Sequence, residues 1–416
     1  MTETPKLPAV WVMGLTNTTF GLFGGFAVIT LAEMLAAQGV SGGRIAATVA
    51  AVLSPGFWAF GLAPLLDVRF SRRTYALVFS MLGALALALT VALRSNLALV
   101  EGLMVFGYFA ASMVQGAVGG WMGSLIDKGQ QSHLGAWFTI ANLGGAGVMI
   151  LVASALMARF SAPTAGALLA SLVMLPSLLY FWIPAPGPDR RAARESFGRL
   201  FVEVLALLRR REVLVALLLF TLPSASFALA NVLGGLGKDF SATERMVSLV
   251  GGIGVVLAGV GGSLLLPPLA RHFRLRPLYL GIGIGGGLFT ASLLLLPHTP
   301  WVFAIALTGE NLCQALAFAA GNAITFETIG RNNPLAATQF TLLISATNLP
   351  IILMGFVDGR AYSWRGVPGA LMTDAAISIV VCLVLAWVLP WINRRGKVAE
   401  LALVGPPGFE PGTKAL

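Results

Sequence analysis

The sequence predicts an all-α polytopic membrane protein with twelve transmembrane helices in two pseudo-symmetric six-helix bundles. Three observations predict this fold: long apolar runs along the whole chain, basic residues in alternate loops between them, and landmarks that repeat at a nearly constant offset. Of the 416 residues, 57% are hydrophobic and 11% are charged. The mean hydropathy of +0.85 argues against a soluble protein.

Each apolar run is long enough to cross a bilayer. A hydrocarbon core about 30 Å thick needs roughly 20 apolar residues per helix. Such runs lie at residues 10–37, 45–66, 74–94, 97–124, 134–158, 165–184, 213–235, 246–268, 277–297, 301–326, 336–357 and 368–391. The N-terminal MTETPKLP has no basic region typical of a signal peptide, so we expect the first helix to remain uncleaved.

Basic residues predict the orientation of the chain. With both termini in the cytoplasm, 20 Lys and Arg residues fall in inner segments and 7 in outer segments, as the positive-inside rule requires. We therefore expect an N-terminal bundle at 1–184, a cytoplasmic linker at 185–212, a C-terminal bundle at 213–391 and a cytoplasmic tail at 392–416. The net charge of +10 comes from these scattered loop arginines, so we expect no nucleic-acid partner.

An internal repeat predicts that the two bundles arose by duplication. The segment LLDVRFSRR at 65–73 is matched by LARHFRLR at 269–276, so that Phe273 follows Phe70 by 203 positions. Phe138 and Thr139 are matched by Phe340 and Thr341 at an offset of 202. These matches occupy the same place in the predicted topology of each half.

Two six-helix halves with a basic middle loop resemble the major facilitator superfamily, whose halves rock about a central site. The loop after the second span carries the most specific likeness. The residues that match the family's motif there are Gly61, Asp67, Arg69, Arg72 and Arg73. Val68 separates the acid from the first arginine, and Ala270 replaces the acid in the second copy. The resemblance therefore implies that the first loop is the stronger latch between the halves.

Six charged residues are candidates for gating at the inner end of the bundles. Asp67 can accept hydrogen bonds from the free N–H groups of a neighbouring helix N-terminus, and Arg69 or Arg73 can pair with Asp127. Arg276 and Glu327 occupy the matching places in the second half. The alternative is that loop charges only anchor the chain at the lipid headgroups. We expect anchoring for Arg72, Arg274 and Arg331.

Glu310 is the candidate for proton or substrate handling. It lies nine residues past Trp301, about 13 Å along a helix at 1.5 Å per residue, which is close to the membrane midplane. Burial disfavours the charged form of a carboxyl, which suits a group that takes up and releases protons. The alternative is a structural carboxyl that stays protonated. Glu33, Glu101 and Asp374 lie nearer span ends, where we expect them to reach headgroups or water.

Neutral polar residues within the spans predict a central, moderately polar pocket. Those chosen as substrate or proton candidates beside Glu310 are Asn17, Gln115, Asn142, Asn231, Asn311, Gln314 and Gln339. For any one of them, a hydrogen bond between helices is the alternative. Only two cysteines are present, and the three histidines lie near span ends, so we expect no metal site, no cofactor and no disulfide.

Several segments resemble the AmpG-like family of muropeptide permeases and acetyl-CoA transporters: APLLDVRFSRR at 63–73, GENLCQALAFAAGNA at 309–323 and AATQFTLLISA at 336–346. Muropeptide permeases carry aspartates in the fourth span, where this chain has Gly116, Gly119 and Gly120. GGWMGSLI, LGAWFTIANLGGAG and LPSASFALANVLGGLG look more like the siderophore-uptake branch.

The resemblance thus implies proton-driven import of a siderophore across the bacterial inner membrane, with muropeptide transport as the alternative. We expect a monomer that contacts only solute, protons and lipid. A membrane enzyme is not expected, because no histidine pairs with a cysteine or carboxylate at a catalytic spacing. A channel is not expected either, because one chain with two halves already encloses a pathway.

Overall fold

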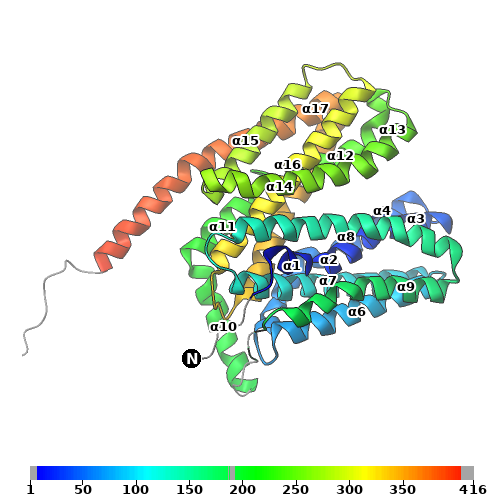
Figure 1. The fold of residues 1–416 in the computed structure, drawn as a ribbon. Coiled ribbons are helices and arrows are strands. Elements are labelled where there is room, and N and C mark those ends of the chain that lie inside the picture. The colour runs from blue at the N-terminus through cyan, green and yellow to red at the C-terminus, as the bar shows by residue number, and fades with distance from the viewer. Residues whose placement is uncertain (1–6, 186, 188–192, 404–416) are drawn as a thin grey trace, which may run out of the picture.

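The computed structural model describes residues 7–185, 187 and 193–403, and the regular structure within them is helical (Figure 1). The N-terminal half contains α1 (Val10–Leu15), α2 (Thr18–Gly25), the π-helical turn η1 (Phe26–Thr30), α3 (Leu31–Ala37), α4 (Gly42–Leu53), α5 (Pro55–Trp58), the 3₁₀ turns η2 (Ala59–Gly61) and η3 (Ala63–Asp67), α6 (Arg72–Ala92), α7 (Leu97–Leu125), α8 (Gln131–Arg159), α9 (Ala162–Met174) and the 3₁₀ helix η4 (Leu175–Trp182).

Helix α10 (Ala193–Arg209) follows the N-terminal half. The C-terminal half contains α11 (Arg211–Thr221), α12 (Leu229–Leu233), the 3₁₀ turn η5 (Gly234–Phe240), α13 (Glu244–Leu249), the π-helical turn η6 (Val250–Gly254), α14 (Val255–His272), α15 (Leu275–Leu293), α16 (Pro300–Ile329) and α17 (Ala336–Leu403). Residues 186, 188–192 and 404–416 of the predicted linker and tail lie outside the described residues.

The helices account for the twelve predicted spans. Nine helices of the described part are long and apolar enough to cross a membrane, and one of them, Ala336–Pro390, has 55 residues. That helix turns at Gly366 (φ 64°, ψ −150°), so it supplies two spans. The glycine-rich α15 and the interrupted pair α11 and α12 complete the set. Helix α17 continues to Leu403, past the predicted end at residue 391, and projects away from the bundles in Figure 1.

The seventh span is broken, whereas the sequence analysis predicts one helix over 213–235. Helix α11 ends at Thr221 and α12 begins at Leu229. Pro223 lacks an N–H group and disfavours helix at the residue before it, which explains why the chain leaves the helix here. Phe227 has a positive φ of 46°, unusual for an aromatic residue. We call residues 222–228 the helix-7 break.

The outer faces of the helices are apolar, as contact with lipid requires. On α6, Met81 and Leu85 are 61% and 55% exposed, while Gly83 and Leu87 on the opposite face are buried. A soluble protein of this size would bury such a row of large side chains. The exposed rows therefore indicate which helix faces point to the hydrocarbon.

The two halves meet at one end of the molecule, which we call the latch end and define by residues 66–73 and 331–339. In Figure 1 the halves converge toward this end, where α10 and α11 lie, and diverge toward the end that carries α4 and α13. We call the latter the far end. A buried apolar cluster at the latch end combines Met113 and Trp121 of the first half with Phe326 and Phe340 of the second.

Repeat-related residues touch each other across the boundary between the halves. The ring of Phe138 lies 5.5 Å from the ring of Phe340, its counterpart in the repeat, and 5.4 Å from the ring of Phe326. Edge-to-face geometry of this kind is favourable for aromatic pairs. Contact between matching positions is what a pseudo-twofold axis between two bundles produces.

Glycines of α7 allow α17 to approach closely. A Cβ atom at Gly120 would collide with the backbone of Ala336 and Ala337, one at Gly119 with the ring of Phe340, and one at Gly116 with Thr341. The physical role of these three glycines in this chain is to let the first turns of α17 pack against α7.

We expect Gly120→Ala to weaken this packing, because the added methyl group meets backbone atoms that cannot rotate away. Overpacking of this kind costs about 1–3 kcal/mol, which thermal unfolding of the purified protein in detergent would detect as a lower Tm. Gly102→Ala on the same helix is the matched control. Gly102 faces open space, so this change should leave Tm equal or slightly higher. Equal behaviour of the two variants would contradict the close approach.

Candidate functional site

A buried carboxylate at the latch end joins the two halves. Asp67, whose side chain is fully buried, accepts hydrogen bonds from the backbone N–H groups of Ala337 (3.1 Å) and Thr338 (2.8 Å). It also accepts one from the Thr338 hydroxyl at 2.7 Å. The first N–H groups of a helix have no partner within it, and the helix dipole favours an anion there. The contact expected of Asp67 is therefore present, and its partner is the N-terminus of α17.

Arg72 extends the latch, although the sequence analysis assigns it to headgroup anchoring. Its guanidinium pairs with Asp67 at 2.8 Å and donates to the carbonyls of Asn333 (2.9 Å) and Pro334 (3.0 Å) in the other half. Only 9% of the side chain is exposed. The fork of five N–H donors explains how one arginine can satisfy a carboxylate and two carbonyls at once. The anchoring interpretation of Arg72 is wrong.

The partner of Asp127 also differs from the expectation. Asp127 pairs with Arg331 of the second half at 2.5 Å, and both side chains are more than half exposed. Arg73 instead donates to the carbonyl of Ile183 and lies over the ring of Trp121 within its own half. Arg331 is thus part of an inter-half contact and not only an anchor.

The remaining gating candidates are placed around the latch. Arg69 adopts a left-handed backbone conformation with φ 68°. Arg276 is half-buried at the start of α15, with a buried Nε atom that lacks a hydrogen-bond partner. Glu327 is exposed near the end of α16. The polar contacts of the latch described above do not include Arg276 or Glu327, whose gating roles remain predictions.

A cavity of about 360 Å³ lies between the halves. The N-terminal half contributes α2, α5, α7 and α8, and the C-terminal half contributes the helix-7 break, α15, α16 and α17. Buried Phe340 closes it on the latch side. Val28 and Ile29, which also line it, are 46% and 41% exposed. The cavity is therefore sealed toward the latch end and accessible from the far end.

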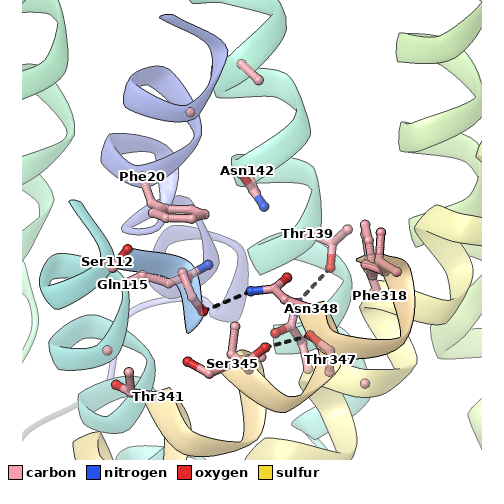
Figure 2. Close-up of a pocket in the computed structure, with 18 of the residues that line it drawn as sticks. Phe20, Ser112, Gln115, Thr139, Asn142, Phe318, Thr341, Ser345, Thr347 and Asn348 are labelled. Atoms are coloured by element: carbon pink, nitrogen blue, oxygen red, sulfur yellow. Dashed lines mark hydrogen bonds between the residues drawn. The ribbon is translucent and has the colours of Figure 1, made fainter. Parts of the chain in front are cut away.

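The lining is neutral and polar with aromatic faces (Figure 2). Among the described residues that line the cavity, none is acidic, basic or histidine. The polar members are Ser112, Gln115, Thr139, Asn142, Ser226, Asn322, Thr341, Ser345, Thr347 and Asn348, and the aromatic members are Phe20, Tyr108, Tyr279, Phe318 and Phe340. Hydroxyl and amide groups can donate and accept hydrogen bonds without bringing a net charge.

Two hydrogen bonds cross between the halves in the cavity wall. The side-chain amide of Asn322 on α16 donates to the hydroxyl of Thr139 on α8 at 3.0 Å. The amide of Asn348 on α17 donates to the carbonyl of Gly56 at 3.2 Å. Both bonds are drawn in Figure 2. Any rocking of the halves must break or rearrange them, so they connect the cavity with the relative position of the bundles.

Only two of the predicted substrate residues, Gln115 and Asn142, line the cavity. Within the described chain neither amide has a side-chain hydrogen bond, so both are available to a solute. The others lie elsewhere: Asn17 is buried and donates to the carbonyl of Phe138, and Gln339 accepts from Asn333 at the latch end. Asn231 is exposed. Asn311 donates back to its own helix at Leu307, and Gln314 donates to the carbonyl of Phe227.

A helical spacing in the sequence indicates part of the lining that the predicted site residues do not include. Thr341, Ser345 and Asn348 are spaced by four and three residues, so they share one face of α17, and all three line the cavity. Thr139 and Thr341 are counterparts in the repeat and both line it. Asn322 and Tyr108 have no such pattern, because their position depends on how α16 and α7 rotate in the bundle.

Glu310 is fully buried in the C-terminal half and is not part of the cavity wall. Its Oε1 atom is hydrogen-bonded to the hydroxyl of Thr290 on α15. Asp374, expected near headgroups or water, is only 2% exposed. That expectation is wrong because Gly366 turns the chain so that the last span packs its Asp374 face inward against α15.

We expect Asp67→Asn to destabilise the protein far more than Asp127→Asn. The first change leaves the buried guanidinium of Arg72 without its counter-charge and places an N–H₂ group among donors, at a cost of about 3–5 kcal/mol. The second removes an exposed ion pair worth about 0–1 kcal/mol. Denaturant or thermal unfolding in detergent measures both. A loss of stability for Asp67→Asn no greater than for Asp127→Asn would contradict the latch as described.

No family model matches the chain, and no curated protein matches its sequence. Solved structures do match. The proton:xylose symporter XylE of the major facilitator superfamily, solved with 6-bromo-6-deoxy-D-glucose, has 13% identity and a TM-score of 0.67, with 90% of this chain and 94% of XylE covered. The major facilitator transporter FucP in its outward conformation has 15% identity and a TM-score of 0.60, with 91% and 99% covered.

A bacterial homologue of the iron transporter ferroportin in an outward-facing state has 15% identity and a TM-score of 0.61, with 91% of this chain and 98% of the homologue covered. At such identities the likeness concerns the fold and not the solute. The likeness extends over nearly the whole length of this chain and of these transporters. The chain has the fold of the major facilitator superfamily.

Proposed function

We propose that this protein is a secondary active transporter that moves a small, uncharged polar solute by alternating access. The observation that carries this proposal is the central cavity, which both halves line and which the latch seals on one side only. A sealed end and an accessible end are the two features that an alternating-access state must combine. The latch consists of polar contacts that water can replace when the halves part, so its opening is a reversible step.

The neutral lining limits the charge of the solute. An ionised group in a cavity without charged side chains needs several hydrogen bonds in place of a counter-charge, and its desolvation otherwise costs several kcal/mol. With no charged side chain among the described lining residues, a net anion or cation is disfavoured. The peptide carboxylates of an anhydromuropeptide would lack cationic partners. A neutral lining therefore favours a siderophore over a muropeptide as the solute, and among siderophores it favours an uncharged ferric complex.

A neutral sugar is a second candidate, supported by a specific feature of the wall. Hydroxyl-rich solutes are held by amides and by aromatic faces, and the cavity combines Gln115 and Asn142 with Phe20 and Phe318. Its volume of about 360 Å³ lies at the lower end of small-molecule pockets. XylE, which binds a bromodeoxyglucose, has the same fold. A compact ferric siderophore would extend from the cavity toward the far end.

The orientation follows from the positive-inside bias. If the latch end with its arginines faces the cytoplasm of a bacterial inner membrane, then the cavity faces outward. That state is the one in which an importer receives its solute, and proton-driven import remains our prediction for the direction and the energy source. The solute panel for the test is therefore an uncharged ferric hydroxamate, an anionic ferric catecholate, an anhydromuropeptide and monosaccharides, each offered to proteoliposomes with and without an inward proton gradient.

Locking the latch should stop transport. The backbone N–H of Asn332 donates to the backbone carbonyl of Ser124 at 3.2 Å, so these residues are direct neighbours across the two halves and are chosen for paired cysteines. We expect oxidation of Ser124→Cys with Asn332→Cys, in a Cys313→Ser, Cys382→Ser background, to abolish solute exchange. Reduction should restore it. Undiminished exchange with the disulfide formed would show that the halves need not separate at this end.

Removing a cavity amide should weaken solute binding. We expect Asn142→Ala to raise the apparent KM for the transported solute about tenfold, since losing one hydrogen bond in a shielded site costs about 1.4 kcal/mol. Asn231→Ala is the matched control, because that asparagine is exposed and lies outside the cavity. Initial uptake rates in proteoliposomes give both values. An unchanged KM for Asn142→Ala would remove this residue from the solute site.

A further inference from the structure

Three carboxyl side chains lie buried together in the C-terminal half, away from the cavity. They are Glu310 on α16 and Asp358 and Asp374 on the two arms of α17. Glu310 and Asp358 are fully buried, and Asp374 is 2% exposed. Each lies within electrostatic reach of the others. None of them lines the cavity between the halves.

Helix geometry places the three carboxyls at a similar depth in the membrane. Asp358 and Asp374 are each eight residues from the turn at Gly366, or about 12 Å along their helices. Glu310 is ten residues from the start of α16 at Pro300, or about 15 Å. All three helix ends lie at the far end, so the carboxyls form a cluster inside the bundle and not at a headgroup.

Four oxygens of this cluster have no hydrogen-bond partner. Both carboxyl oxygens of Asp358 are buried and unpaired, as are Oε2 of Glu310 and Oδ1 of Asp374. No lysine or arginine of the described chain is paired with any of the three, and the thiol of Cys313 is the other titratable group beside Glu310. Three ionised carboxylates cannot coexist in such a place, because each would be desolvated and repelled by the other two.

The hydrogen bonds of the Thr290 hydroxyl indicate that the carboxyl of Glu310 carries a proton. It lies 3.0 Å from the carbonyl of Gly286 and is also hydrogen-bonded to Glu310. A hydroxyl has one proton, and a carbonyl can only accept. An ionised Glu310 would have to share that one proton with the Gly286 carbonyl, whereas a protonated Glu310 that donates to Thr290 satisfies both contacts, with Thr290 donating to Gly286. The described chain holds no group of three His, Cys, Asp or Glu side chains arranged for a metal ion.

We propose that Glu310, Asp358 and Asp374 form a shared proton-binding site, with at least two protons on the three carboxyls, separate from the solute cavity. Glu310 is the one member of this site predicted from the sequence, and the structure adds two acids from the last two spans. The site is built by three helices of one half, so it can gain or lose protons without direct contact with the solute.

The helix-7 break connects this site with the cavity. Gln314, one turn past Glu310 on α16, donates to the carbonyl of Phe227 at 3.0 Å, and Cys382 donates to the carbonyl of Ser224 at 2.8 Å. Ser226, which lies between Ser224 and Phe227 in the break, lines the cavity. A Cβ atom at Gly283 would collide with the Ser224 carbonyl, and one at Gly286 with the ring of Phe227. The break therefore packs directly on the helices that carry the acids.

Proton occupancy can be measured without any solute. Infrared spectroscopy of the purified full-length protein in lipid nanodiscs at neutral pH resolves the C=O stretching band of protonated carboxyls. We expect this band in the wild type, a weaker band in Glu310→Gln, Asp358→Asn and Asp374→Asn, and its loss in the triple variant. Glu33→Gln, which changes an exposed acid, should leave it intact. A band that is absent in the wild type, or unaffected by the three single changes, would overturn the proposal.

Sodium provides the competing outcome. If the band disappears when sodium replaces choline at constant ionic strength, and labelled sodium binds to the wild type but not to Asp358→Asn, the cluster is a sodium site and the proton assignment fails. These readouts do not depend on transport. Failure of the proposed transport function would appear as absence of uptake for every solute tested, with the infrared band unchanged.

The link through the helix-7 break rests on the proposed function and has its own test. We expect Gln314→Leu to keep the infrared band and solute exchange but to lose gradient-driven accumulation, because α16, which carries Glu310, would lose its hydrogen bond to the break. Full gradient-driven accumulation in Gln314→Leu would exclude this residue as the connection.

Discussion

The carboxylate of Asp67 at the N-terminus of α17 is the interaction on which this conformation depends. It satisfies two backbone N–H groups and one hydroxyl of the other half, and Arg72 neutralises it while bonding two further carbonyls there. Because both side chains are buried, removing either one leaves a charge without a partner. The cavity is sealed on this side only as long as these contacts hold.

The latch requires a close approach of backbones, and the glycines of α7 supply it. Acidic or larger residues at Gly116, Gly119 and Gly120 would keep the first turns of α17 away. The small size of these glycines and the lack of charged side chains among the described cavity-lining residues favour the same interpretation: a neutral pocket whose closed end is held by main-chain contacts across the two halves.

The structure separates two groups of polar residues by their electrostatics. Neutral hydroxyls, amides and aromatic rings line the space between the halves, whereas the buried acids lie within one half behind the helix-7 break. Under the proposed function, acids placed outside the cavity would keep the charge of bound protons apart from the solute. The helix-7 break is packed between the two regions and connects them. Its Phe227, with a positive φ, is held by contacts from α15 and α16, and its Ser224 accepts a hydrogen bond from Cys382 of α17.

The sequence by itself determined the number of spans, the division into two halves and the latch acid. Hydrophobic length, the repeat of Phe138 and Phe340, and the pairing of an acid with a helix start are local or periodic properties, so they can be read without coordinates. Helix rotation and side-chain partners are not local. Only the tertiary structure decided that Arg72 is buried and that Asp127 pairs with Arg331. It also placed Asn17 and Gln339 outside the cavity lining, and Asp358 and Asp374 near Glu310. Which face of a helix points to lipid, to the cavity or to a neighbouring helix depends on how all twelve spans pack together. In a span that is apolar on every face, the hydrophobic pattern does not reveal this orientation.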